Sequence, residues 1–172
     1  VKVLAPCRMD DSDELRTYHE SLLIQLADAC RRTRHEFLLE IITARPDKLA
    51  APDQIHALME RFYELGIFPD WWKLEPVLES GFWKRCGDIV RANDAQMQGI
   101  IVLGKEAKPE VLASVFRNAR AESLVKGFAV GRTIFAGAAQ NWLNGRIDDD
   151  MAVTTMTDLF AGLINAWDEA GE

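Results

Sequence analysis

Cysteine is scarce in this sequence, and its spacing excludes two kinds of site. The chain has three cysteines, Cys7, Cys30 and Cys86. Their odd number and wide separation predict neither a disulfide framework nor a zinc site. The sequence also lacks a P-loop, a dinucleotide-binding glycine motif, a nucleophile elbow and a CxxC pair. Any chemistry must therefore come from residues that no short motif marks.

Long apolar runs and positive charge are also lacking. No hydrophobic stretch approaches the roughly 20 residues of a membrane-spanning helix, and no signal-peptide pattern is present, so we expect a soluble protein without membrane association, in the cytoplasm. The net charge of -7 and the pI near 5.0 argue against nucleic acid or an anionic membrane as a partner. An anionic substrate would need a local positive site.

Five short apolar runs alternate with helical patterns along the chain. Each run is continuously hydrophobic, as is typical of parallel strands covered on both faces. The runs are VKVLAP (1–6), FLLEIIT (37–43), WWKLEP (71–76), GIIVLG (99–104) and KGFAVGR (126–132). Helical patterns occupy 12–33, 51–66, 80–92, 108–119, 134–145 and 148–169. This βα rhythm predicts a parallel sheet with helices packed outside it.

The helix expected over 12–33 has a clear start and an apolar stripe. Ser12 is a good N-cap, because its hydroxyl can accept a hydrogen bond from the first helical turn. The residues predicted to form the apolar stripe are Leu15, Tyr18, Leu22, Leu23 and Leu26. This stripe is expected to face the sheet.

Two α/β architectures fit five βα units in 172 residues. A five-stranded open, doubly wound sheet fits this length without further units. A (βα)8 barrel of TIM type needs about 250 residues, so residues 1–172 would be a single domain holding the five C-terminal βα units of a longer barrel. Lys2, Glu40 and Lys73 lie in the middle of apolar strands and favour the barrel, whose lumen can hold charges. The start at Val1, inside a strand-like run, agrees with a piece of something longer.

Lys73 lies inside the apolar run WWKLEP, and two interpretations of it stay open. A lysine that acts as a nucleophile must lose its proton near neutral pH, which needs desolvation or a nearby cation. The two tryptophans beside it could supply the desolvation, and Lys2 on another strand could supply the cation. Alternatively, Lys73 is half of a structural ion pair that fills one layer of the lumen.

Glu40 and Glu75 are the candidates for acid–base work. Each is a carboxyl group within or directly after an apolar strand, where burial favours the neutral form that can donate a proton. The alternative is that the two carboxylates only balance the charges of the lysines.

Two strand ends carry residues suited to binding an anion. Gly131 and Arg132 end the last strand just before a helix, and Gly104 and Lys105 end the strand before it. Glycine lets backbone N–H groups approach an anion, a helix N-terminus favours negative charge, and arginine adds a fork of donors. In barrels, phosphate commonly sits at the last two strands. The alternative for Gly131 and Arg132 is a simple helix-capping role.

Several of these motifs occur in the order of one family. With FLLEII, LGIFPDWWKLEP, GIIVLG and VKGFAVGRTIFAGAAQNWLNGRI in register, almost the whole chain resembles the C-terminal module of bacterial 5-dehydro-2-deoxygluconokinase fusion proteins of myo-inositol catabolism, a domain of unknown function. Through WWKLEP, FLLEII and GFAVGRTIF it is more distantly similar to class I tagatose-bisphosphate aldolases, which are (βα)8 barrels with a Schiff-base lysine. It departs from those aldolases in GKEAKPE, which replaces a small, serine-bearing loop.

The resemblance implies a role for each candidate residue. Lys73 would form an imine with a substrate ketone, and Glu40 would move protons. Glu75 and Lys2 would tune the site. The residues at the two strand ends, Gly131 with Arg132 and Gly104 with Lys105, would hold a phosphate. The implied reaction cleaves 2-deoxy-5-keto-gluconate 6-phosphate, a phosphorylated sugar acid, to dihydroxyacetone phosphate and malonate semialdehyde. This carbon–carbon lyase reaction needs no metal and no organic cofactor.

The alternative to an aldolase is a module without catalysis, attached to the kinase of such a fusion. That module would bind a phosphosugar or hold copies of the chain together. An active chain could instead be one part of a bifunctional kinase–aldolase. In each case we expect a homo-oligomer or docking to an N-terminal or kinase portion.

Overall fold

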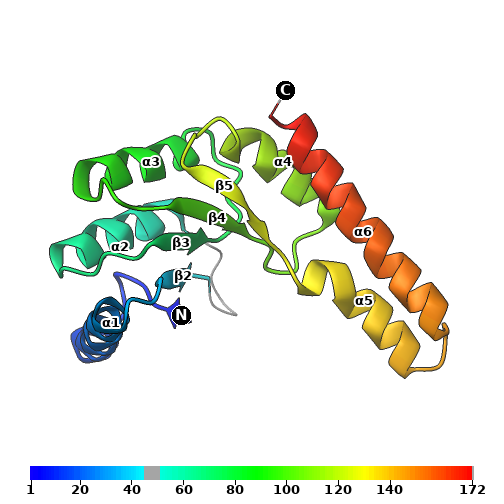
Figure 1. Cartoon of the computed structure of the whole chain (residues 1–172), viewed down its shortest axis with the longest axis horizontal. Helices are drawn as coiled ribbons and strands as arrows, with labels where there is room; N and C mark the ends of the chain where they lie inside the picture. The colour runs from blue at the N-terminus through cyan, green and yellow to red at the C-terminus, as the bar shows by residue number, and fades with distance from the viewer. Residues whose placement is uncertain (45–50, 172) are drawn as a thin grey trace.

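The computed structural model describes residues 1–44 and 51–171 of the chain (Figure 1). Strands and helices alternate, and two helices follow in succession at the end. The strands are β1 (Lys2–Pro6), β2 (Leu38–Ile42), β3 (Trp71–Leu74), β4 (Gly99–Leu103) and β5 (Val125–Ala129). The helices are α1 (Asp13–Thr33), α2 (Pro52–Glu64), α3 (Phe82–Asn93), α4 (Pro109–Ala119), α5 (Arg132–Leu143) and α6 (Asp149–Glu169). Each element overlaps the run or pattern that the sequence predicted for it.

The described strands form one sheet, in which each strand is parallel to its neighbours and the spatial order is β1-β2-β3-β4-β5. Helices α1 to α4 follow one another along one side of this curved sheet (Figure 1). A doubly wound sheet reverses its strand order at a switch point, so that alternative prediction is wrong. Strands added one after another in one direction build a barrel. The units therefore form a partial barrel of TIM type, which confirms the preferred fold prediction.

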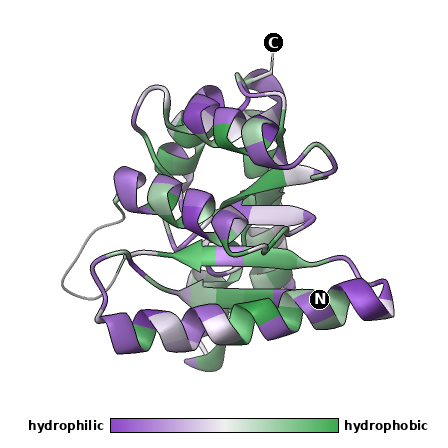
Figure 2. Cartoon of the chain, turned by 90° about the vertical axis from the view of Figure 1, so that its left-hand side faces the viewer, coloured by the Kyte–Doolittle hydropathy of each residue, from purple (hydrophilic) through white to green (hydrophobic). Residues whose placement is uncertain are grey.

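The core lies between the sheet and the helices. Side chains alternate between the two faces of each strand, and the strand residues buried completely in this core are Leu39, Ile41, Trp72, Leu74, Ile100 and Val102. Trp72 donates its indole N–H to the hydroxyl of Tyr63 in α2 over 2.8 Å. Burial raises the pKa of Tyr63 to about 12, so its hydroxyl stays neutral in the core. In Figure 2 the helices on this side carry both hydrophilic and hydrophobic residues, and the strands behind them are hydrophobic or pale in colour.

Helix α1 packs through a stripe that only partly agrees with the predicted one, since of the predicted residues Leu23 is buried and Leu26 packs against the core. Its buried residues are Glu20, Leu23, Ala27 and Cys30, whereas Leu15, Tyr18 and Leu22 are exposed. Glu20 is part of the contact because its two carboxylate oxygens accept hydrogen bonds from the guanidinium of Arg61 in α2, at 2.9 and 3.0 Å. The predicted N-cap is confirmed, since the hydroxyl of Ser12 accepts a hydrogen bond from the Leu15 N–H at 3.3 Å.

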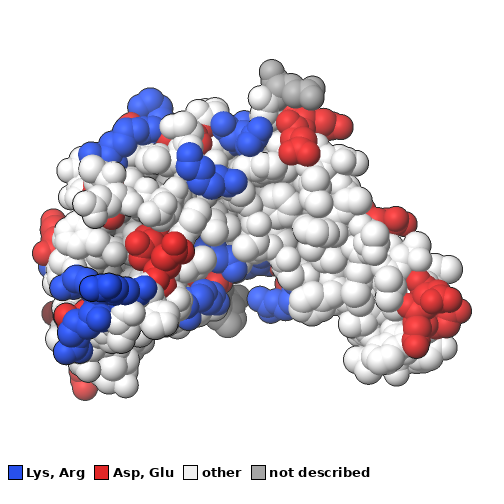
Figure 3. Space-filling model, in the orientation of Figure 1, with Lys and Arg blue, Asp and Glu red and all other residues white. Residues whose placement is uncertain are grey.

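Helices α5 and α6 extend away from the sheet (Figure 1). The C-terminal end of α6 is held by α4, where Trp167 meets Phe116 edge to face at 5.3 Å and lies 4.9 Å below the guanidinium of Arg120. Figure 3 shows a broad uncharged surface over α5 and α6, bordered by acidic side chains near the turn between them. Within the part of the chain that the structure describes, every helix is too short or too polar to act as a transmembrane segment.

The concave face of the sheet is the face opposite helices α1 to α4. In the described residues no helix covers this face, and the edge strands β1 and β5 pair on one side only. Leu4 lies on it and is 46% exposed. Because strand residues alternate between faces, Lys2, Glu40 and Lys73 share this face with Leu4 and point away from the core.

Candidate active site

Glu40, Lys73 and Lys2 come together on the concave face. Strands β2 and β3 are in a register that places Glu40 directly beside Lys73. One carboxylate oxygen of Glu40 lies 3.2 Å from the Nζ atom of Lys73 and 2.7 Å from the Nζ atom of Lys2. The carboxylate therefore bridges ammonium groups from the strands on either side of it. We call these three residues the triad.

Shielding from water differs across the triad. The side chain of Glu40 is 4% exposed, that of Lys73 is 14% exposed and that of Lys2 is 48% exposed. The shared oxygen of Glu40 makes ionic contacts with both lysines but no hydrogen bond of good geometry. A depression of about 280 Å³, lined by Lys2, Leu38 and Trp71 among others, opens on the same face. Of the triad, Lys2 lines this depression. The triad thus pairs a shielded lysine with a carboxylate, as nucleophilic catalysis needs.

Glu75 belongs to a second cluster, at the carboxyl ends of the strands. It directly follows β3, and it is completely buried. One of its oxygens accepts hydrogen bonds from the N–H and the hydroxyl of Thr43, at 2.7 and 2.6 Å, and its other oxygen forms an ion pair with Lys105. The carboxylate therefore ties together the ends of β2, β3 and β4. This geometry fits a residue that positions the strand ends.

The two glycines predicted at the phosphate site lie at the same edge of the sheet. Gly104 directly follows β4, and a Cβ atom at this position would lie 2.6 Å from a side-chain carbon of Val130. Only glycine therefore lets the ends of β4 and β5 approach so closely. Gly131 is the N-cap of α5. The structure thus brings the two glycines to adjacent loops, as a shared site requires.

The two cations predicted at the phosphate site are both engaged by carboxylates of the chain. Lys105 pairs with the buried Glu75, and Arg132, the first residue of α5, pairs with Glu106. The guanidinium and the carboxylate of the second pair are both more than half exposed. Of the two cations, Arg132 is therefore the easier one for an incoming anion to reach.

Three residues at this edge are absent from the sequence-based candidates: Arg8, Thr43 and Glu106. Arg8 follows β1, is buried, and donates hydrogen bonds to the carbonyl of Thr43 at 2.8 Å and to Asp10 at 2.6 Å. The carboxyl ends of parallel strands meet at one edge of a sheet. A polar residue at the end of an apolar run (Thr43) or within two positions of it (Arg8) was therefore the signal that could have identified both.

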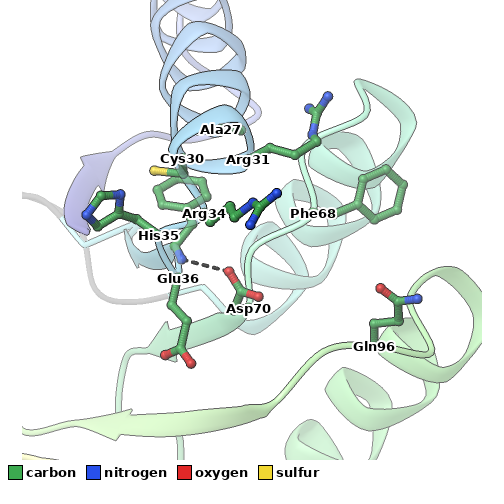
Figure 4. Close-up of a pocket in the computed structure, with 10 residues that line it drawn as sticks. Ala27, Cys30, Arg31, Arg34, His35, Glu36, Phe68, Asp70 and Gln96 are labelled. Carbon is green, nitrogen blue, oxygen red and sulfur yellow. Dashed lines mark hydrogen bonds between the residues drawn. The ribbon is translucent and has the colours of Figure 1, made fainter.

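Figure 4 shows a pocket of about 390 Å³ near the amino ends of β2 and β3. Arg31, Arg34 and His35 at the end of α1 contribute to its lining. Asp70, just before β3, accepts a hydrogen bond from the N–H of Phe37 at 2.7 Å, which joins the starts of the two strands. The pocket lies at the opposite edge of the sheet from Glu75 and is separate from the candidate site.

Comparison with known proteins identifies a family and a fold. The family model described as "Uncharacterized protein conserved in bacteria (DUF2090)" matches residues 1–171. No curated protein matches the chain. A fructose-bisphosphate aldolase from Plasmodium falciparum, solved in complex with TRAP and a small-molecule inhibitor, has a TM-score of 0.60 at 12% identity, covering 99% of this chain and 55% of that one. Cgl0159 from Corynebacterium glutamicum has a TM-score of 0.57 at 18% identity, covering 92% of this chain and 50% of that one. The chain thus spans about half the length of these structures, and the likeness shows a shared barrel fold.

Proposed function

The chain belongs to the DUF2090 family of uncharacterized bacterial proteins, and we propose that its barrel carries out class I aldolase chemistry. The observation that carries this proposal is the 3.2 Å contact between Lys73 and Glu40 on the open face of a partial barrel. The fold that the chain shares with a fructose-bisphosphate aldolase supports it. The reaction type is the cleavage of the carbon–carbon bond between the α and β carbons of a ketone that carries a hydroxyl on its β carbon.

In the first step, Lys73 acts as the nucleophile. Its neutral amine adds to the substrate ketone, and loss of water leaves an iminium ion on the Nζ atom. Glu40 lies within contact of this nitrogen and can take the proton that the ammonium must lose. It then returns this proton to the hydroxyl that leaves as water, so that Glu40 is a carboxylate again before the second step. Lys2 contacts the same oxygen at 2.7 Å and would hold the Glu40 carboxylate in place. Lys2 thus has a positioning role.

In the second step, the iminium ion accepts the electrons of the bond that breaks. Glu40 removes the proton of the hydroxyl on the β carbon, which becomes the carbon of an aldehyde. The electron pair of the bond between the α and β carbons moves towards the iminium ion and forms an enamine. Protonation of the enamine carbon and addition of water then release the ketone product and regenerate Lys73. The sequence of steps needs neither a metal nor an organic cofactor.

The substrate we propose is 2-deoxy-5-keto-gluconate 6-phosphate, in accord with the family resemblance in the sequence. An imine at C5 would direct cleavage between C3 and C4, which yields malonate semialdehyde and dihydroxyacetone phosphate. Arg132, Lys105 and the adjoining backbone at Gly131 and Gly104 would bind the phosphate, because these groups lie at one edge of the sheet. A homo-oligomer or a fused kinase portion would be the partner of this domain.

Reductive trapping tests the proposal. The protein is incubated with dihydroxyacetone phosphate, reduced with borohydride, digested, and mapped by mass spectrometry. We expect an adduct on Lys73 that is lost in Lys73→Met and retained in Lys126→Met, which removes an exposed lysine of β5. Absence of an adduct on folded protein that demonstrably binds the ligand would refute Schiff-base chemistry.

The second candidate function is a phosphosugar-binding or oligomerisation module without catalysis. The observation in its favour is that the triad is also the arrangement of a structural ion network, in which Glu40 neutralises buried lysine charge. This function predicts that Lys73→Met keeps or increases stability, because Glu40 retains its ion pair with Lys2 at 2.7 Å, and that it leaves ligand binding unchanged. Aldolase chemistry predicts that the same variant binds ligand but forms no adduct.

A further inference from the structure

The ion pair between Glu106 and Arg132 occupies the cation that the proposed function assigns to the substrate phosphate. Glu106 lies in the loop after β4, and Arg132 begins the helix that follows β5. Arg132 is the first residue of α5, and the guanidinium offers a planar fork of donors that suits a carboxylate or a phosphate equally. An anion that approaches this group therefore meets a site already filled by a side chain of the same chain.

The backbone that presents Glu106 is held in an unfavourable conformation. Lys105 and Glu106 are consecutive non-glycine residues with positive φ angles, 49° and 59°. Side chains with a Cβ atom rarely adopt this left-handed region. Such strain persists only where the surroundings impose it, so the position of Glu106 is imposed by its neighbours.

Contacts on both sides of Glu106 impose this position. Before it, Gly104 packs against Val130 so closely that a Cβ atom would lie 2.6 Å from a side-chain carbon. After it, the carbonyl of Ala107 accepts a hydrogen bond from the Thr133 hydroxyl at 3.0 Å, and the Ala107 N–H donates to the Gly104 carbonyl at 2.9 Å. The loop after β4 is thereby fastened to the start of α5, with Glu106 opposite Arg132.

We propose that Glu106 is a built-in competitor for the anionic group of the substrate at Arg132. This inference rests on the proposed function, because it concerns the same anion site. A phosphate must displace the Glu106 carboxylate before it can take both donors of the guanidinium. The protein therefore binds phosphate more weakly than its cations alone would allow, and competition by Glu106 determines the size of this loss.

The effect is modest in size, because both partners are more than half exposed and water screens their attraction. Exposed ion pairs of this kind correspond to at most about a five-fold change in an equilibrium. We expect Glu106→Gln to tighten the binding of inorganic phosphate by about two- to five-fold. Glu106→Asn provides a second variant, because asparagine tolerates the left-handed backbone and folds without added strain.

Isothermal titration calorimetry with inorganic phosphate and with dihydroxyacetone phosphate tests the proposal. Glu110→Gln is the matched control: it removes the same charge from an exposed residue four positions further along. We expect Arg132→Gln to weaken binding, and Glu106→Gln to bring no further gain in the Arg132→Gln background. Charge removal without competition would instead give equal gains in Glu106→Gln and Glu110→Gln.

The proposal is overturned if both Glu106 variants bind phosphate no more tightly than the Glu110 control, or if their gain persists without Arg132. Its failure is distinguishable from that of the proposed function. An adduct on Lys73 together with unchanged phosphate binding in the Glu106 variants would reject only the competitor role. Tighter phosphate binding in those variants without any adduct would reject only the aldolase chemistry.

Discussion

Replacing Glu40 by glutamine keeps the shape of the side chain but removes the negative charge that lies against Lys2 and Lys73. Loss of one partner from a buried ion pair costs about 3–5 kcal/mol, because the remaining charge is left without compensation. Lys2 is half exposed and can turn towards water, whereas Lys73 is largely shielded. We therefore expect Glu40→Gln to lower the free energy of unfolding by about 3 kcal/mol, the lower end of that range.

Urea denaturation followed by tryptophan fluorescence is a suitable assay, because Trp71 and Trp72 directly precede Lys73 in β3. With a denaturant slope of about 1–3 kcal/mol per molar, the unfolding midpoint should fall by about 1–3 M. The matched control is Glu60→Gln, which makes the same change in an exposed pair with Arg85 at 2.8 Å. Exposed pairs contribute little, so the control should lose less than about 1 kcal/mol.

The double variant Glu40→Gln/Lys73→Met distinguishes coupling from a general loss of packing. Removing the shielded ammonium together with its partner leaves no uncompensated charge, so we expect most of the lost stability to return. Two results would refute this reasoning. Either Glu40→Gln loses no more stability than Glu60→Gln, or the two substitutions in the double variant simply add.

Two further predictions concern stability away from the triad. The imidazole of His56 stacks on Phe82, and burial lowers the pKa of His56 below its usual value of about 6.5. The unfolded chain then binds the proton more readily than the folded one, so stability is present above that value and is lost as the pH falls below it. His56→Phe should therefore flatten the decline of Tm between about pH 7.5 and 5.5, and an unchanged slope would contradict this. On the sheet, Gly99→Ala would place a methyl group 2.9 Å from the ring of Trp71 and should cost about 1–3 kcal/mol in thermal denaturation. Gly127→Ala meets no atom within 4 Å and should be nearly neutral, so equal losses would rule out overpacking as the cause.

The positions of strands and helices follow from local patterns, whereas the contacts of a helix do not. The apolar runs were sufficient to place all the described strands, because a buried parallel strand needs continuous hydrophobicity. The stripe predicted on α1 was wrong at Leu15, Tyr18 and Leu22. The helix instead turns Glu20 towards α2, where Glu20 forms an ion pair with Arg61. No local sequence pattern in either helix predicts this ion pair.

Some residues of the candidate site could likewise be identified from local sequence patterns, whereas their partners could not. A charge between core residues of a strand must face away from the core, which is why Glu40 and Lys73 could be singled out from their own short runs. The partners of Glu75 and Arg132 could not, because Lys105 and Glu106 lie 30 and 26 positions away and exposed loop residues carry no hydrophobic signal. One residue predicted to bind phosphate is thus paired with a residue predicted to act in catalysis.

Period-two alternation within each strand is a short-range property, and it places Lys2, Glu40 and Lys73 each on the side of its own strand opposite the core residues next to it. Whether they touch depends on strand order and register, which arise from pairing between segments more than 30 residues apart. The order β1-β2-β3-β4-β5 places the strand of Glu40 between those of the two lysines, and the register of β2 and β3 sets Glu40 beside Lys73. A doubly wound sheet built from the same runs would follow a different strand order. Long-range pairing therefore converts three separate charges into one triad.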